Sequence, residues 1–131
     1  MKKYFKTSLI AGLLIFVLSV IFSFYQIRKD VKQACLKAKD LYQQNCVDSL
    51  IAFAKSDDNS FREKNSAIWA LGQIADKSAL PFLNGLKNSL QGQKRCNSSK
   101  YLCRYEIEKA VRWCEEGNVT SWMYRNRENW K

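Results

Sequence analysis

The sequence of 131 residues contains no histidine. This absence excludes the Ser-His-Asp and Cys-His arrangements that activate a nucleophile, and it excludes zinc sites of the HExxH type. The chain also lacks a Cys-x-x-Cys pair and a glycine-rich loop that could cradle a phosphate. Its acidic residues stand at expected helix ends and on polar faces, without a pattern that marks a cleft. We therefore expect a protein that is not an enzyme and that binds no metal and no cofactor.

Proline and glycine are also scarce, with one and five residues respectively. A β-sandwich or β-barrel would need many more of them for its turns, so their scarcity favours helices. The hydrophobic fraction of 47% is too high for a disordered chain. Because the length leaves room for one small domain, the composition predicts a single all-α domain.

The one long uncharged stretch lies near the N-terminus, at residues 9–25 (LIAGLLIFVLSVIFSFY). It follows three lysines in the first six residues and ends shortly before Arg28. At about 1.5 Å per residue its roughly 17 to 19 residues reach about 26 to 28 Å, which is at the short end of what a bilayer core requires. We expect a basic tail over residues 1–8 and a transmembrane signal-anchor helix over residues 9–27.

A cleaved signal peptide is the competing interpretation, because a basic start followed by an apolar core has that shape too. Residues 20–26 are bulky where a cleavage site needs small side chains, so an uncleaved anchor is preferred. Basic residues flank the span on both sides, and only the very short basic tail favours a cytoplasmic N-terminus. The following domain would then lie outside the cytoplasm, in the periplasm or at the cell exterior.

All five cysteines follow the apolar stretch, at Cys35, Cys46, Cys96, Cys103 and Cys114. Two pairs and one unpaired cysteine would fit an oxidising compartment, but an odd count also fits ordinary buried thiols. Cys96 and Cys103 bound a polar loop that a disulfide would close; two free thiols are the alternative. Cys35 and Cys114 occupy apolar positions of the helical pattern, so we expect them to be small buried hydrophobic residues.

Beyond residue 30, apolar residues recur at helical spacing in short blocks. The blocks cover residues 31–43, 46–55, 61–75, 79–86 and 105–116. Ser60 and Glu63 predict a capping box at the start of the third helix. Pro81 stands in the first turn of the fourth, where its missing N–H costs little, and Gly117 would end the fifth.

The blocks also align with one another when the sequence is shifted by 33 residues. The shift pairs Ala67 with Ala34, Ile68 with Cys35, Leu71 with Ala38, Ile74 with Leu41, Leu80 with Val47 and Leu83 with Leu50. Small residues around Gly72 permit close helix approach, and we expect helix 79–86 to cover the apolar stripe of helix 61–75. Such a pair must stack on neighbours, and helix 105–116 can supply the third layer.

The string Ala70-Leu71-Gly72-x-Ile74-x-Asp76, followed by Ala79-Leu80-Pro81-x-Leu83, resembles a HEAT-like repeat of the short variety found in phycobilisome lyase-type proteins. The likeness covers about residues 31–90, and the preceding unit is degenerate, with Lys37 where the motif has Ala70. The resemblance implies a short α-solenoid of about two to three helix pairs over residues 28–117. Repeat folds do not imply an activity, so the expected product of this domain is a binding surface.

The last fourteen residues, 118–131, combine aromatic and basic side chains. Arginine interleaved with aromatic residues is typical of interface hot spots and equally of segments at a membrane surface. We predict that partner binding depends on Trp122, Tyr124, Arg125, Arg127 and Trp130. The alternative is an extension that folds back to cap the last helix pair, with Trp122 in the core.

Together these features predict a membrane-anchored protein-interaction module or an accessory subunit of a membrane or envelope complex. Its partners would be proteins, with residues 9–27 in the membrane. A rival hypothesis follows from residues 31–131, whose 17 basic and 11 acidic residues give a charge of +6, enough for weak attraction to anionic lipid or nucleic acid. Nucleic acid would require a cytoplasmic domain and is therefore disfavoured.

Overall fold

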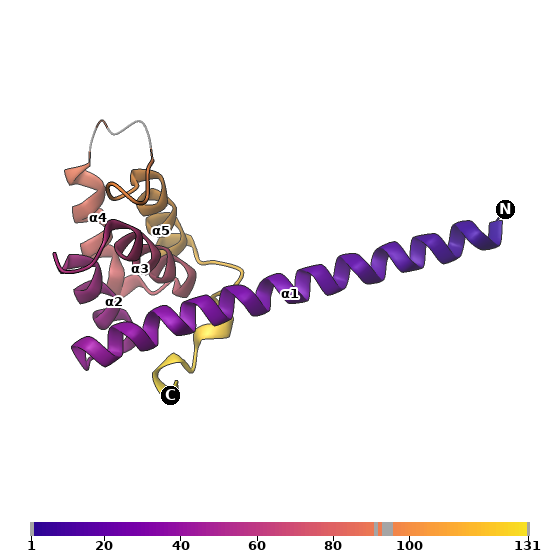
Figure 1. The fold of residues 1–131 in the computed structure, drawn as a ribbon, viewed down its shortest axis with the longest axis horizontal. Coiled ribbons are helices and arrows are strands. Elements are labelled where there is room, and N and C mark those ends of the chain that lie inside the picture. Colours follow the sequence, from indigo (N-terminus) through magenta and orange to yellow (C-terminus); the bar gives the residue numbers. More distant parts are fainter. Residues whose placement is uncertain (1, 91, 93–95, 131) are drawn as a thin grey trace.

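The structure, a computed structural model, describes residues 2–90, 92 and 96–130. Over these residues it contains helices and turns but no strand, so the predicted all-α class is confirmed. The α-helices are α1 (Lys2–Tyr42), α2 (Cys46–Lys55), α3 (Phe61–Ile74), α4 (Leu80–Ser89) and α5 (Arg104–Glu116). Three 3₁₀ turns complete the order: η1 (Lys77–Ala79), η2 (Ser121–Tyr124) and η3 (Arg127–Asn129). Figure 1 shows α1 projecting far beyond a cluster formed by the other helices.

Helix α1 joins the apolar stretch to the domain without a break, so the boundary predicted after residue 27 lies inside one helix. Its apolar side chains between residues 9 and 22 are exposed, whereas Val31, Cys35 and Ala38 are fully buried in the domain. The segment is long and apolar enough to cross a membrane by length and composition. One helix therefore both projects from the domain and forms part of its core.

Local sequence signals set most helix ends as predicted. The side chains and backbone N–H groups of Ser60 and Glu63 form the reciprocal capping box at the start of α3. Pro81 stands in the first turn of α4. Gly117, with φ of +91°, ends α5 and donates its N–H to the carbonyl of Trp113 at 2.9 Å. Positive φ is a conformation that glycine adopts at little cost, which explains this position.

The core forms where α3 packs against α2 and α5, while α1 lies against α2 and α3. Gly72 marks the tightest approach, because a Cβ atom there would lie 2.8 Å from the Cα atom of Ala110. The close contact expected at Gly72 therefore exists, but it is made with α5 and not with the helix predicted at 79–86. That helix, α4, packs its backbone most closely against α5 and η1.

The repeat alignment agrees with the observed burial at several positions. Cys35 and Ile68, Ala38 and Leu71, and Leu50 and Leu83 are all buried in the core. Leu41 is the exception, since the alignment pairs it with buried Ile74 but its side chain is 57% exposed. The next residue, Tyr42, is the last residue of α1, and its side chain turns inward instead. Its ring meets the Phe53 ring edge-on, with 6.4 Å between the ring centres. The burial pattern therefore departs from the repeat in the last turn of α1 and agrees with it again in α2 and α4, at Leu50 and Leu83.

Two disulfides constrain the domain. Cys35–Cys46 joins α1 to the start of α2, and Cys96–Cys103 closes the loop before α5, with Cα–Cα distances of 5.3 and 5.0 Å. The expectation of an unpaired Cys35 was wrong, because the turn after α1 brings Cys46 back beside it. Cys114 is buried and free as expected, and burial, followed by the charges of Asp76 and Glu115, raises the pKa of its thiol to about 12.

Candidate functional site

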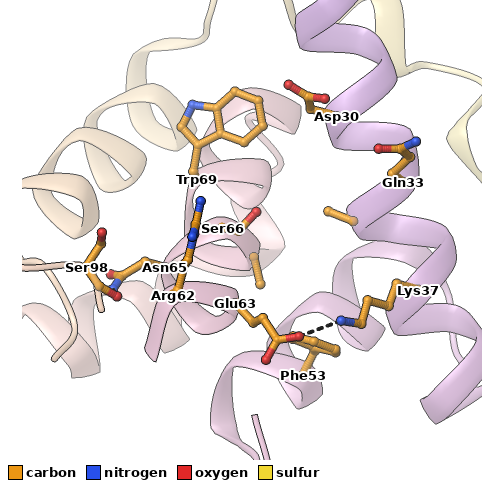
Figure 2. A pocket seen from close by; sticks show the side chains of 12 residues that line it. Asp30, Gln33, Lys37, Phe53, Arg62, Glu63, Asn65, Ser66, Trp69 and Ser98 are labelled. Carbon is orange, nitrogen blue, oxygen red and sulfur yellow. Dashed lines mark hydrogen bonds and ion pairs between the residues drawn. The ribbon is translucent and has the colours of Figure 1, made fainter. Parts of the chain in front are cut away.

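Two surfaces lie where α1 enters the domain. The first is the α1–α3 groove, a depression of about 570 Å³ between these helices, and the second is the C-terminal tail, residues 118–130. Figure 2 shows the groove with side chains from α1 and α3 facing each other across it. We describe the groove first and then the tail.

The walls of the groove are two rows of side chains at helical spacing. Asp30, Gln33 and Lys37 come from α1, and Arg62, Ser66 and Trp69 come from α3. Residues three or four positions apart lie on one face of a helix, which explains both rows.

Small side chains keep the groove open between these walls. Ala34 on α1 and Ala67 on α3 lie in the lining, and the two positions are paired by the 33-residue alignment. A larger residue at either position would fill the space between the helices. The groove thus depends on alanine at both aligned positions.

An ion pair closes one end of the groove, where Lys37 Nζ lies 2.6 Å from Glu63 Oε1. The hydrogen bond from Lys37, followed by those from Ser60, lowers the pKa of Glu63 to about 2. Lys37 Nζ also lies 5.4 Å from the centre of the Phe53 ring, which lines the groove below it. Figure 2 shows this pair bridging the two helices.

Three of the remaining polar side chains of the groove are free to meet a ligand. In the part of the chain that the structure describes, the side chains of Asp30, Gln33 and Arg62 form no hydrogen bond or ion pair. Trp69 is half-buried, so part of its ring is accessible from the groove. The groove therefore offers an acidic, an amide, a guanidinium and an aromatic group within one depression.

A buried asparagine that the sequence did not single out holds the loop beside the groove. The Asn65 side chain donates to the carbonyls of Phe61, Ser98 and Tyr101 and accepts the N–H of Cys103 at 2.9 Å. Its two N–H groups are shared among the three carbonyls, and its oxygen accepts one bond, so the amide is anchored within the protein. Asn65 therefore fixes the disulfide-closed loop against α3, with Ser98 at the edge of the groove.

The C-terminal tail folds back onto the domain, and the five residues predicted for partner binding take different environments. Tyr124 is fully buried and meets the half-buried Trp130 edge-on at 6.1 Å. Arg127 pairs with Asp76 and, through Nε at 3.4 Å, with Glu128. Trp122 and Arg125 are exposed. In this structure only Trp122 and Arg125 present most of their surface to solvent.

The fold-back alternative placed Trp122 in the core, but Tyr124 takes that position. The two residues belong to η2, and a 3₁₀ helix has three residues per turn, so side chains two positions apart point in different directions. Burial of Tyr124 therefore leaves Trp122 facing outward, 63% exposed. Burial also raises the pKa of the Tyr124 hydroxyl.

Polar contacts hold both ends of the tail. The buried Gln73 accepts hydrogen bonds from Thr120 Oγ1 at 2.7 Å and from Asn118 Nδ2 at 3.2 Å. At the other end the Glu128 carboxylate accepts the N–H of Cys46 at 3.1 Å. A carboxylate at a helix N-terminus is favourable, because the first N–H groups have no partner within the helix.

The ion pair between Asp76 and Arg127 adds a third attachment. Partial burial raises the pKa of Asp76, but hydrogen bonds from Ser78 and the charge of Arg127 outweigh it and lower the pKa overall. The pair ties the tail to the end of α3. The tail therefore contributes to the folded domain as well as to its surface.

No protein-family model matches the chain, and no curated protein or solved structure matches it. Within residues 2–90, 92 and 96–130, no three potential metal ligands come together. The two surfaces are thus defined by their own geometry: a polar groove with one aromatic group, and a tail with one exposed tryptophan and one exposed arginine.

Proposed function

We propose that the chain is a membrane-anchored protein-interaction module without enzymatic activity, and that the α1–α3 groove receives a segment of a partner protein. The observation that carries this proposal is that α1 supplies both the apolar stretch and one wall of the groove. Asp30 in the groove is only five positions after Tyr25, the end of that stretch, which is about 8 Å along a helix. A partner in the same membrane would meet the groove close to the bilayer surface.

The side chains of the groove suit a peptide segment. Asp30 and Arg62 can pair with charges of either sign, Gln33 can bond a backbone amide, and Trp69 offers a flat apolar face. Tryptophan and arginine are enriched among the residues that dominate interface energies. These features support an accessory subunit of a membrane or envelope complex.

The proposal also includes the cellular compartment of the domain and its membership of a class of helical repeats. Two disulfides in the domain favour an oxidising compartment, and with the short basic N-terminal tail they support a cytoplasmic N-terminus and a domain outside the cytoplasm. The shared burial of Cys35 with Ile68 and of Leu50 with Leu83 supports HEAT-like helix pairs.

Photocrosslinking in native membranes tests the groove. A benzoyl-phenylalanine in place of Gln33 should form a discrete crosslink to one membrane protein, and Trp69→Ala in the same chain should reduce its yield at least several-fold. Asn88, exposed on α4, provides the matched control position and should give no such product. Equal products from both positions, or a yield unchanged by Trp69→Ala, would exclude the groove as the binding site.

A further inference from the structure

The tail runs along α1 towards the apolar stretch. Lys39 Nζ donates to the Glu128 carbonyl at 3.1 Å, which places the end of the tail beside the last turn of α1. The start of the tail lies farther along α1, on the side of the apolar stretch (Figure 1). In Figure 1 the connection between α5 and η2 forms the edge of the domain on the side towards which α1 projects.

Exposed apolar side chains gather at this edge. Val119 is 78% exposed and Trp122 is 63% exposed, although Thr120 and Tyr124 beside them are buried. Tyr25, the last residue of the apolar stretch, is 64% exposed on α1. The chain thus directs a valine and a tryptophan outward at the point where its projecting helix leaves the domain. Singly exposed apolar residues are common, but this pair lies on the edge of the domain from which the predominantly apolar part of α1 projects.

The charges at this edge are mixed. Arg28, Lys29 and Arg125 are exposed, but the carboxylates of Glu115 and Glu116 end α5 just before Gly117. Attraction to an anionic surface is therefore partly cancelled. The apolar pair is the component that distinguishes this edge.

We propose that residues 118–125 form a second membrane contact, in which Val119 and Trp122 enter the interfacial layer of the bilayer that α1 crosses. The proposal rests on the membrane anchor of the proposed function and adds that one face of the domain is held against the lipid. Tryptophan favours this layer because its ring is largely apolar and its indole N–H can still reach water. Since α1 already holds the domain at the membrane, the second contact is intramolecular and a small apolar area suffices.

Spin-label accessibility in the full-length protein tests this contact. The protein is reconstituted in phosphatidylcholine nanodiscs with one label at Val119→Cys, Ser99→Cys or Phe16→Cys. Ser99 is exposed in the loop before α5, at the opposite end of that helix from Val119, and Phe16 is exposed within the apolar stretch. We expect the Val119 label to be protected from a water-soluble nickel complex and accessible to oxygen, as a label at the interface is. The Ser99 label should stay fully accessible to nickel.

Two further variations separate apolar insertion from charge attraction. Trp122→Ser in the Val119→Cys chain should restore nickel accessibility, because Trp122 is exposed and its removal leaves the core unchanged. Adding anionic phosphatidylglycerol should change the protection little, because Glu115 and Glu116 offset the nearby basic residues. A contact that forms only with anionic lipid would overturn the apolar mechanism.

The outcomes distinguish this inference from the anchor on which it rests. Equal nickel accessibility at Val119 and Ser99, with the Phe16 label protected, would overturn the second contact and leave the anchor intact. An accessible Phe16 label would overturn the anchor itself. Protection at Val119 only when a copurified protein is present would assign this edge to a protein partner and overturn the membrane contact.

Discussion

The contact between α3 and α5 at Gly72 gives the sharpest test of the packing. Gly72→Ala places a Cβ atom 2.8 Å from Ala110 Cα, 3.0 Å from Ala110 Cβ and 3.0 Å from Trp113 Cε3. The nearest obstacle is backbone, so α3 and α5 must separate to admit one methyl group. Overpacking of this kind costs about 1 to 3 kcal/mol, and the three simultaneous contacts place it near the upper end.

Alanine also favours the helix over glycine by about 1 kcal/mol, which offsets part of this cost. The expected net loss for Gly72→Ala is therefore about 2 kcal/mol. For a domain of this size, a change of about 1 kcal/mol shifts Tm by about 4 to 8 °C, so Tm should fall by roughly 8 to 16 °C. The transition is best followed by near-UV circular dichroism of the full chain in detergent, because the exposed part of α1 contributes helix signal but no tertiary packing.

Gly85 provides a matched control in α4, because a Cβ atom there meets nothing within 4 Å. Gly85→Ala gains the same helix propensity without a clash and should raise the free energy of unfolding by about 0.5 to 1 kcal/mol. The two substitutions are chemically identical and should have opposite signs. If Gly72→Ala were as stable as Gly85→Ala, the close approach of α3 and α5 would be refuted.

Three further predictions concern the core, the tail and the compartment. Leu71→Asp places an unpaired carboxylate at a position that is only 1% exposed. It should lower the free energy of unfolding by several kcal/mol and abolish the cooperative near-UV transition. An unchanged Tm would mean that α3 is rotated about its axis and that Leu71 faces solvent. The folded state lowers the pKa of Asp76 below its ordinary 3.8. The stability that the ionised Asp76 carboxylate contributes is therefore complete above pH 3.8, and it is lost as the pH falls through the lowered pKa of the folded state. Asp76→Asn should therefore lower Tm more at pH 7 than at pH 2, and equal effects at both would remove the ion pair as the cause. In denaturant without reductant only Cys114 should react with an alkylating agent. Alkaline phosphatase fused after Lys131 should be active, and a fluorescent protein fused there in a separate chain should not fluoresce. Several alkylated cysteines, or fluorescence without phosphatase activity, would place the domain in the cytoplasm.

Local signals made the helices predictable. The Ser60–Glu63 capping box and Gly117 act within one turn of the helix ends they set, so their effect is readable from neighbouring residues. The inward phase of α3 follows from its apolar spacing, and Leu71 is buried as that spacing predicts. The exposure of Leu41 could not be predicted from the same spacing. Helix α1 ends at the next residue, and apolar periodicity does not show where a neighbouring helix stops covering α1.

Contacts between distant segments could not be predicted in this way. Glu128 accepts the N–H of Cys46 at the start of α2, although the two residues are 82 positions apart in the sequence. The residues around either one give no sign that they will meet. The rows of side chains that line the groove can be read from helical spacing, but which rows face each other depends on how α1 packs on α3. In the tail the choice of Tyr124 over Trp122 for the core depends on the 3₁₀ turn that precedes Arg125.

Because α1 is one uninterrupted helix, a tilt of its membrane-spanning part is transmitted rigidly to the domain. No proline occurs in this helix and its single glycine is Gly12, so no residue between the apolar stretch and Tyr42 provides a hinge. The disulfide from Cys35 to α2 fixes the far arm to the domain. In a bilayer a tilt of about 20°, typical of membrane-spanning helices, would displace Tyr42, about 25 Å beyond Tyr25, by roughly 9 Å. A change in the tilt of α1 would thereby turn the whole domain, and the direction in which its groove opens, without any change in its internal structure.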